Sequence, residues 1–213
     1  MILNKKKIFV IGSGGHSRPV IENLKMLGKN KINLFDIKFS KNKENSVLGV
    51  KVLDDFKSIN LKKIKKKTNF YIAIGENKLR KKYFKYLKKF VVLPNLKSKK
   101  SFISPNSKIG KANFFNHFSF LGPNTKIGNN NILNTYSLIE HDVDIGDNCH
   151  ICPGVKIGGR TKIGDNVFIG IGSVIINNIK ICSNVTIGAG SLIYKNIIKP
   201  GTYINQKVLK LKK

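Results

Sequence analysis

Hydrophobic residues recur at every sixth position through the C-terminal half of the chain. From Ile103 to Ile193 there are sixteen such positions without a break, each of them Ile, Leu or Phe. Glycine follows directly in eight of them, and a small or β-branched residue comes four positions later in most. A helix repeats about every 3.6 residues and a strand every 2, so neither explains a period of six. A β-helix does, because each flat face takes one hexad and three faces close an 18-residue coil.

Residues 18 apart in this repeat are expected to stack on one another in neighbouring coils. One predicted interior column contains Ile103, Leu121, Ile139, Ile157, Ile175 and Ile193. The pattern therefore predicts an all-β parallel β-helix over residues 101–195.

The first 97 residues lack the hexads and alternate between strand and helix patterns. Residues 7–11, 32–36, 70–75 and 91–94 are typical of buried strands, and residues 18–27 and 77–90 of amphipathic helices. This alternation predicts a small parallel α/β sheet, Rossmann-like but short. We expect an α/β domain over 1–97, a linker at 97–100, and a tail over 196–213 beyond the last coil.

A glycine-rich turn, residues 12–17, lies between the first predicted strand and the first helix. Glycines there let backbone N–H groups approach a phosphate, with help from the helix N-terminus. Asp36 ends the second strand, where such folds contact a ribose or a base. The turn is not a full G-x-G-x-x-G, so a redox dinucleotide is not expected. A glycine-rich turn without a ligand is the alternative interpretation.

The formal net charge of +29 suggests nucleic-acid binding, but the composition argues against it. Only three of the forty basic residues are arginine (Arg18, Arg80 and Arg160), whereas readers of bases and phosphates favour the forked guanidinium. The lysines are spread over surface-like positions and form no single stripe in the sequence. No apolar run approaches the roughly 18 residues that span a bilayer, and the N-terminus does not resemble a secretory signal. We therefore expect a cytoplasmic protein without nucleic-acid partners.

Cys149 and Cys152 match the C-x-x-C pattern of redox and zinc sites. The hexad register points Cys149 toward the coil interior, and the chain has no second thiol pair to complete four ligands. We predict packed free thiols and no metal site.

Four histidines are candidates for chemistry: His16, His117, His141 and His150. His141 lies between Glu140 and Asp142, and a carboxylate can fix the tautomer of an imidazole and stabilise its protonated form. A histidine suits the removal of a proton from an amine or hydroxyl that attacks a thioester. His117 has no carboxylate next to it in the sequence, so we interpret it as an ordinary exposed histidine.

Residues 134–141, Asn-Thr-Tyr-Ser-Leu-Ile-Glu-His, followed by Ile145-Gly146 and His150, resemble the active-site coil of the bacterial sugar O/N-acyltransferase family. The likeness extends over nearly the whole chain, from Gly14-Gly15-His16 through Arg80 to the coils ending at Leu192. It implies a left-handed β-helix, a homotrimer with active sites between subunits, and acetyl-CoA as the acyl donor without a metal. Within the family, the likeness is greatest to N-acetyltransferases of nucleotide-linked 4-amino sugars, with a UDP- or GDP-linked acceptor.

The resemblance also implies roles for individual residues. His141 would be the general base, with Asp142 in the place of the family's orienting carboxylate. The residues implied for the nucleotide-sugar side are Gly14, Gly15, His16, Asp36, Gly75, Asn77 and Asn134. The residues implied for the acetyl-CoA side are His150, Gly159, Ile171, Gly172 and Ala189, of which Gly159 offers a backbone N–H to the oxyanion.

Three departures from the family pattern leave alternatives open. Asp142 is shorter than the usual Glu, so Glu140 or an acid of a neighbouring subunit is also a candidate for orienting His141. Asp36 is followed by Ile37 instead of a second acid, which leaves the nucleotide undecided. The tail around Tyr203 lacks the usual ending, so its CoA contacts do not carry over.

Other functions fit the same repeat less well. O-acetylation of sialic acid is the principal alternative. A β-helical carbonic anhydrase needs three imidazoles on zinc, with paired histidines five apart, whereas His141 and His150 are nine apart. A purely structural β-helix would need neither His141 nor the glycine-rich turn.

Overall fold

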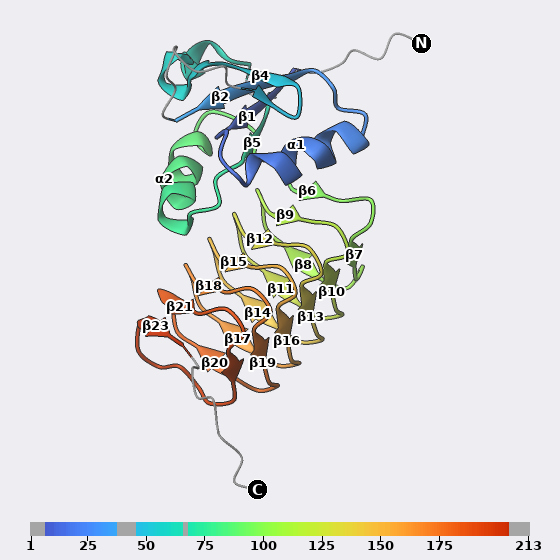
Figure 1. The fold of residues 1–213 in the computed structure, drawn as a ribbon, viewed down its shortest axis with the longest axis vertical. Helices are drawn as coiled ribbons and strands as arrows, with labels where there is room; N and C mark the ends of the chain where they lie inside the picture. The colour runs from blue at the N-terminus through green and yellow to red at the C-terminus, as the bar shows by residue number, and fades with distance from the viewer. Residues whose placement is uncertain (1–6, 38–45, 66–67, 205–213) are drawn as a thin grey trace, which may run out of the picture.

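The computed structural model describes residues 7–37, 46–65 and 68–204, and these form two parts (Figure 1). A small α/β domain contains the N-terminal residues, and a solenoid of stacked coils extends away from it. Within the described residues, no helix is both long enough and apolar enough to cross a membrane.

The α/β domain is built on one five-stranded sheet in the order β3-β4-β2-β1-β5. Its elements are β1 (Ile8–Ile11), α1 (Ser17–Met26), β2 (Ile32–Asp36), β3 (Ser46–Val47), β4 (Val50–Asp55), β5 (Asn69–Ile72) and α2 (Asn77–Leu87), with short 3₁₀ turns at Phe56–Ser58 and Leu61–Lys63. All pairings are parallel except β3 with β4, which form an antiparallel hairpin at one edge.

Most of the predicted elements of this domain are confirmed, and two predictions need correction. The segment 91–94 forms no strand of its own, because only Val92 bridges to Asn69 of β5. Strands β3 and β4 lie in a region for which we predicted no element. The helix ends follow ordinary capping: Glu76 accepts hydrogen bonds from the N–H groups of Lys78 and Leu79 at the start of α2, and Gly28 takes a φ of +73° after α1.

Each helix covers a different face of the sheet, because side chains alternate along a strand. Ile8 and Val10 of β1 pack with α1, whereas Phe9 and Ile11 pack on the side of α2. The α1 side also includes Phe114 of the solenoid. Helix α1 is therefore sandwiched between the sheet and the first coils of the solenoid (Figure 1).

The solenoid is a left-handed parallel β-helix with three faces. Face 1 contains β7 (Phe102–Ile103), β10 (Phe120–Leu121), β13 (Leu138–Ile139), β16 (Lys156–Ile157), β19 (Val174–Ile175) and β22 (Leu192–Ile193). Face 2 contains β8 (Lys108–Ile109), β11 (Lys126–Ile127), β14 (Asp144–Ile145), β17 (Lys162–Ile163) and β20 (Lys180–Ile181). Face 3 contains β6 (Leu96–Lys97), β9 (Phe114–Phe115), β12 (Ile132–Leu133), β15 (His150–Ile151), β18 (Phe168–Ile169), β21 (Val185–Ile187) and β23 (Gly201–Tyr203).

The predicted interior column is confirmed residue by residue. Its six members are consecutive partners in the parallel register of face 1. Solenoid pairing begins at β6, just before the predicted linker, and continues to β23 within the predicted tail. These short end strands pair because the adjacent coil offers unpaired backbone groups to them. Residues 205–213 of the predicted tail lie outside the described residues.

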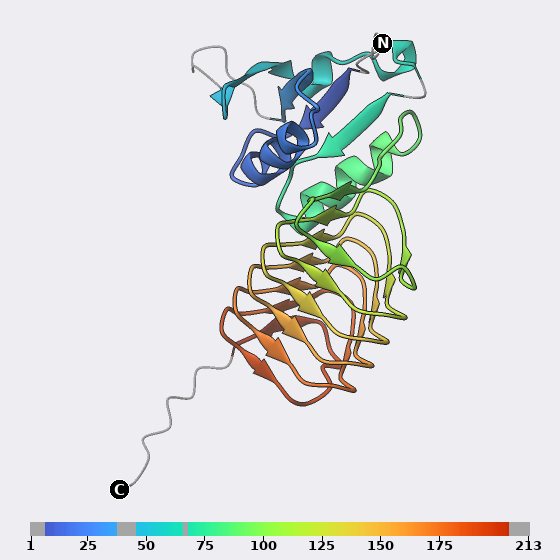
Figure 2. The ribbon, with the colours of Figure 1, turned by 90° about the vertical axis from the view of Figure 1, so that its right-hand side faces the viewer.

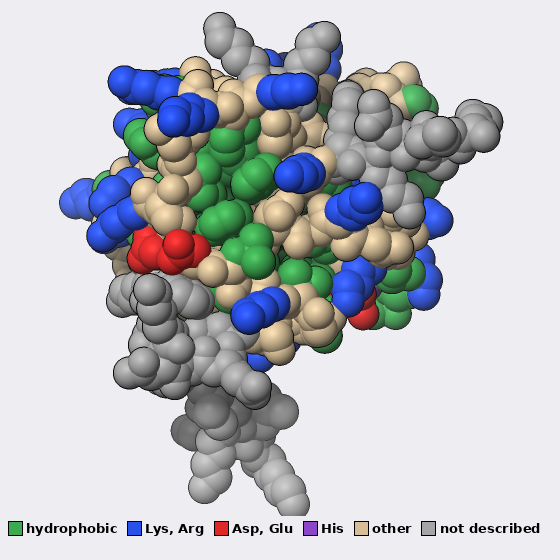
Figure 3. Space-filling model, turned by 90° about the horizontal axis from the view of Figure 1, so that it is seen from above, with side chains coloured by type: hydrophobic (Ala, Val, Ile, Leu, Met, Phe, Trp, Pro, Cys, Tyr) green, Lys and Arg blue, Asp and Glu red, His purple; other side chains and the backbone are tan. Residues whose placement is uncertain are grey.

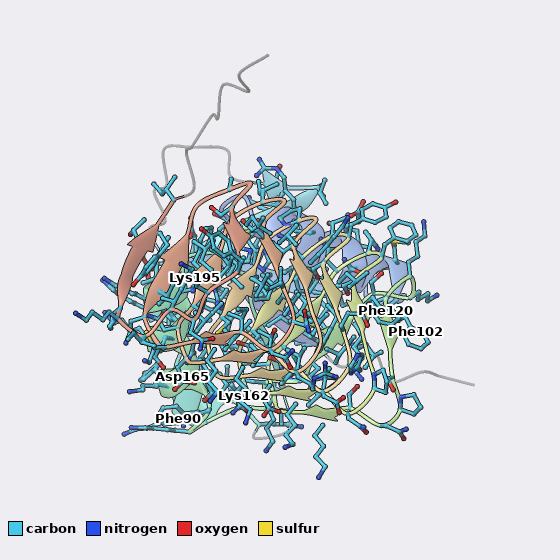
Figure 4. All side chains as sticks on the ribbon, turned by 90° about the horizontal axis from the view of Figure 1, so that it is seen from below. Phe90, Phe102, Phe120, Lys162, Asp165 and Lys195 are labelled. Atoms are coloured by element: carbon cyan, nitrogen blue, oxygen red, sulfur yellow. The ribbon has the colours of Figure 1, made fainter. Side chains whose placement is uncertain are left out.

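The outer sides of the faces differ in charge, and this corrects our expectation that lysine forms no stripe. Face 2 carries Lys108, Lys126, Lys162 and Lys180 in one row, interrupted by Asp144, whose carboxylate lies 3.8 Å from Lys126 Nζ. The 18-residue spacing of these lysines already places them in one row, and the expectation overlooked it. Face 1 instead carries Phe102 and Phe120, stacked 5.1 Å apart, on another side of the prism from Lys162 (Figure 4). Seen from above, the α/β domain has apolar side chains in its centre with Lys and Arg spaced around them (Figure 3).

Arg80 of α2 joins the two parts and is only 2% exposed. Its guanidinium donates to the carbonyl oxygens of Gly75 at 2.8 Å, Asn130 at 3.0 Å, and Asn148 and Cys149 at 3.0 Å each. The planar fork supplies five donors, which a lysine cannot do. Burial lowers the pKa of Arg80 to about 10, so it stays charged at neutral pH. The side chain thereby fixes α2 beside the upper coils (Figure 2).

We expect the Arg80→Met variant to lose about 3 kcal/mol or more of unfolding free energy, because several buried carbonyl oxygens lose their donor. Urea unfolding measures this change. Arg160→Met is the matched control, since Arg160 is exposed and, within the part of the chain that the structure describes, its side chain hydrogen-bonds only to that of Asn178. Equal stability of the two variants would show that Arg80 does not hold the parts together.

Candidate active site

The glycine-rich turn faces open space in front of α1. Gly12 takes a φ of +102°, and a Cβ there would lie 2.9 Å from the carbonyl oxygen of Ala73. Gly14 and Gly15 are different, because an added Cβ would meet nothing within 4 Å. Among the described residues, no acceptor is found for the N–H groups of Gly14 and Gly15. The turn can therefore present backbone donors to an anionic group.

Asp36 lies against this turn, as its position after β2 predicted. Its Oδ2 accepts a hydrogen bond from the Ser13 hydroxyl at 2.6 Å, and its Oδ1 accepts from the Ile37 N–H at 2.6 Å. The carboxylate thus fixes the conformation of the turn. Its remaining lone pairs can still accept a ligand hydroxyl.

His16 and His150 come from different parts of the chain and meet where the α/β domain touches face 3. Their ring centroids are 6.1 Å apart. Burial, with the charges of His150 and Arg80, lowers the pKa of His16 to about 3. Burial and the Arg80 cation lower the pKa of His150 to about 4. Both imidazoles are therefore neutral at pH 7, and Nε2 of His16 is buried without a partner among the described residues.

Gly75 and Asn134 lie beside the two histidines, and Asn77 lies beside Arg80. The Gly75 carbonyl accepts from Arg80 and lies 3.2 Å from His150 Nδ1. The Asn77 amide is already used, since it donates to the Val167 carbonyl and accepts from Arg80. Asn134 lies with its Nδ2 3.5 Å from His150 Nε2. We conclude that Asn134 and His150 face a common site, whereas the side chain of Asn77 supports the domain contact.

His141 and Asp142 form the corner between faces 1 and 2. The Nδ1 atom of His141 lies 2.8 Å from Oδ2 of Asp142. Asp142 has a φ of +58°, a left-handed conformation that Asp tolerates better than most residues, and its side chain thereby reaches back to the imidazole. The hydrogen bonds from His141 and Asn124 lower the pKa of the Asp142 carboxyl. Asp142, not Glu140, is thus the acid that contacts His141 within one chain.

Gly159 lies one coil below His141, directly under the ring. A Cβ at this position would come within 2.7 Å of His141 Cε1 and 2.8 Å of Nε2. Only glycine leaves room for the imidazole there. No acceptor is found among the described residues for the N–H of Gly159, so this donor is free beside His141.

Ile171, Gly172 and Ala189 lie along a different corner, between faces 3 and 1. Ile171 is 61% exposed, and Gly172 has a φ of +68° in the turn. Asn134 lies on the same corner, in a higher coil. These residues form an edge that runs down the solenoid from the domain contact.

One chain does not bring all the predicted site residues together. His141, Asp142 and Gly159 share the corner between faces 1 and 2, whereas His150 lies on face 3 and Asn134 on the corner beyond it. Among the described residues, no hydrogen bond or ring contact joins His141 to His150. The two histidines are consecutive in the hexads but on different sides of the prism, so a site that uses both needs two chains.

The cysteines lie as the hexad register predicted. Cys149 is fully buried, and its Sγ lies 3.1 Å from the Gly164 carbonyl. Burial raises the pKa of the Cys149 thiol to about 12. In the described ranges, no three His, Cys, Asp or Glu side chains are grouped to hold a metal ion.

Two family models match the chain. The model of the PglD N-terminal domain matches residues 7–87, and that of the bacterial transferase hexapeptide (six repeats) matches residues 124–159 and 160–195. None of the curated proteins compared with the chain matches it significantly.

Solved structures extend this similarity over both parts of the chain. The acetyltransferase domain of PglB from Neisseria gonorrhoeae, in complex with acetyl coenzyme A, is 26% identical over 97% of this chain and 99% of that one, with a TM-score of 0.86. PerB from Caulobacter crescentus, in complex with CoA and GDP-perosamine, is 25% identical over 93% and 94%, with a TM-score of 0.85. These matches identify the chain as an acyltransferase and fit the bacterial sugar acyltransferase family. WeeI from Acinetobacter baumannii, 22% identical over 94% and 97% with a TM-score of 0.77, shares the fold.

Two features of this acyltransferase were missed in the sequence. The buried role of Arg80 was missed, although an arginine in a chain so rich in lysine was a usable signal. The interpretation of His117 as an ordinary exposed histidine was wrong, because its side chain is only 18% exposed. Glu22 Oε2 lies 3.4 Å from its Nε2, and Ser98 Oγ lies 2.6 Å from its Nδ1. Glu22 is far from His117 in sequence, so only the packing of α1 on the solenoid reveals the pair.

The buried histidines should make the acyltransferase less stable in acid. An unfolded histidine takes up a proton near pH 6.5, whereas His150 does so near pH 4 when folded. The unfolded state therefore binds more protons as the pH falls through this window, and the unfolding free energy decreases. We expect His150→Gln to remove up to about 3 kcal/mol of the decrease between pH 7 and pH 4, measured by urea unfolding.

Thr186→Gln is the control for this experiment, because Thr186 is exposed on the same face and does not titrate. Its pH dependence should match that of the wild type. An unchanged pH dependence in His150→Gln would contradict the prediction.

Proposed function

We propose that this acyltransferase transfers the acetyl group of acetyl-CoA to the amine of a nucleotide-linked 4-amino sugar. The observation that carries the proposal is the His141–Asp142 pair stacked over Gly159, since it combines a base, its orienting acid and a free N–H on one corner. The bound ligands of the two structural relatives, acetyl coenzyme A in one and CoA with GDP-perosamine in the other, support this substrate pair. We also place this reaction in the cytoplasm.

The chemistry follows from the arrangement of the corner. With the Nδ1 proton of His141 donated to Asp142, Nε2 is left as the base. The sugar amine attacks the thioester carbonyl carbon, Nε2 takes the amine proton, and the Gly159 N–H donates to the developing oxyanion. The C–S bond then breaks, and the proton passes to the CoA sulfur. Both substrates are bound during this direct transfer, and no acetyl-enzyme forms.

The α/β domain supplies binding energy remote from the reacting amine. We assign nucleotide-sugar binding to residues 1–97, with Gly14, Gly15 and His16 at the phosphates and Asp36 at the nucleoside, and acetyl transfer to residues 101–195. Asn134 lies where the sugar leaves this domain. Remote contacts of this kind hold the amine in position for attack. Ile171, Gly172 and Ala189 offer the exposed edge for the pantetheine and nucleotide of CoA.

A homotrimer completes the site in this proposal. His141 of one chain would face Asn134 and His150 of the next, because one chain keeps them on different sides of the prism. Face 1 is the surface that suits burial between subunits, since Phe102 is 55% exposed and stacks on Phe120. Phe118 and Tyr136, stacked 4.8 Å apart on the adjoining corner, extend this apolar surface. The lysine row of face 2 does not suit it.

The first test is direct competition between acceptors. Supplied with acetyl-CoA, the enzyme should release CoA faster with UDP- or GDP-linked 4-amino sugars than with free sialic acid, because only the former engage the glycine-rich turn. Thiol release measures the rate. The Lys180→Ala variant, on face 2 and outside the proposed interface and ligand residues, controls for preparation effects. Faster acetylation of sialic acid would replace the proposal with O-acetyl transfer.

The second test uses mixed subunits. His141→Ala should lower kcat about 10²–10⁴-fold, and Asn134→Ala should weaken the sugar side. Neither variant alone supplies a complete site. When the two are denatured together in equal amounts and refolded, one interface in each mixed trimer regains both groups, so about a quarter of wild-type activity should return.

Separately refolded variants, mixed afterwards without exchange, are the control and should stay inactive. A site within one chain predicts no recovery, which would contradict the composite site. A light-scattering mass equal to that of the 23.9 kDa monomer would contradict the trimer itself.

A further inference from the structure

Asn23 is a buried amide in the apolar side of α1, only 1% exposed beside Leu24. Its Nδ2 donates to the Pro19 carbonyl at 2.8 Å and to Oδ1 of Asn116 at 3.1 Å. Its own Oδ1 is buried without a partner among the described residues. An unpaired buried acceptor costs about 1–3 kcal/mol. The Asn23 side chain is therefore oriented so that its NH₂ group donates. Its unpaired oxygen lowers the stability of the fold, which a leucine at this position would not do.

Asn116 continues the hydrogen-bond chain into the solenoid. It lies 18 residues before Asn134, in the same corner column, and is 3% exposed. With Oδ1 occupied by Asn23, its Nδ2 donates to Asn134 Oδ1 at 3.0 Å and to Thr135 Oγ1 at 2.8 Å. The direction of these bonds is fixed, because the Pro19 carbonyl at the start can only accept.

The chain ends at His150. Asn134 Oδ1 also accepts from the Thr135 N–H at 2.9 Å, so its Nδ2 is the group that faces His150 Nε2. On the far side of the ring, Nδ1 lies 3.2 Å from the Gly75 carbonyl, which can only accept. Both ends therefore require the same tautomer, with the proton on Nδ1 and a lone pair on Nε2.

We propose that Asn23 and Asn116 are positioning residues of the acetyltransferase site, which act through Asn134 to hold His150 with an unprotonated Nε2 facing the substrates. The contact from Asn134 to this nitrogen is long, at 3.5 Å, so an N–H or O–H group of a bound substrate can replace it. The low pKa of His150, about 4 because of burial and Arg80, keeps the ring neutral as this role requires. The effect on turnover rests on the proposed function, whereas the tautomer does not.

The test reads the tautomer directly by the ¹⁵N shifts of His150 in the ¹⁵N-histidine-labelled full-length chain, with His150→Gln used for assignment. Asn116→Asp keeps the shape, but its carboxylate cannot donate to Asn134 Oδ1. The Asn134 amide should then reverse and present Oδ1 to Nε2. We expect the proton to move at least partly to Nε2, with about a tenfold fall in kcat/KM for the nucleotide sugar.

Asn113→Asp is the matched control, because Asn113 is 1% exposed near the same coil and, among the described residues, its side chain bonds only to the Gly128 carbonyl and the Asn131 N–H. It should leave the tautomer and kcat/KM unchanged even if the melting temperature falls. Should Asn116→Asp not fold, Asn23→Leu removes the first donor while filling the same space. It should also give a mixed tautomer.

The outcomes separate the two proposals. A wild-type tautomer in every folded relay variant would overturn the positioning role. A changed tautomer in a protein whose wild type acetylates no nucleotide-linked amino sugar would support the positioning role and refute the proposed function.

Discussion

The six-residue spacing of interior side chains is the constraint on which the rest of the structure depends. Each interior residue packs on its partner one coil away, and the backbone of each coil bonds to the next. Every corner residue is therefore fixed over the residue 18 positions on. This register places His141 over Gly159 and Asn116 over Asn134. The candidate chemistry is carried by these corner residues, whose identity the hydrophobic repeat does not specify.

The second constraint is the contact between the α/β domain and the solenoid. Arg80 donates to carbonyl oxygens of three solenoid residues and two residues of its own domain, and α1 shares its apolar side with Phe114. These contacts bring the ring centroids of His16 and His150 to 6.1 Å from each other. The same packing explains why both histidines are buried and neutral. The site joins parts far apart in sequence because this contact is buried and well hydrogen-bonded.

The sequence was informative where a local rule applied. The hexads predicted the solenoid and its interior column, and short apolar runs alternating with helical patterns predicted β1, β2 and β5. It was less informative for 91–94, an apolar run in which only Val92 forms a bridge to the sheet. It also gave no sign of the β3–β4 hairpin at the edge of the sheet. Sixteen unbroken repeats predict one structure, whereas a single short apolar run fits either a strand or another buried segment.

By itself the sequence determined the 18-residue coil of the β-helix and the inward direction of the Cys149 side chain. It also determined that a base, His141, and an acid, Asp142, are adjacent. Adjacent residues such as His141 and Asp142 need only a turn to meet. The tertiary structure alone decided that Glu22 contacts His117, that Arg80 donates to carbonyl oxygens of the upper coils, and that His16 lies beside His150. The physical reason is that these relations depend on the packing of whole coils and domains, which a linear spacing does not encode.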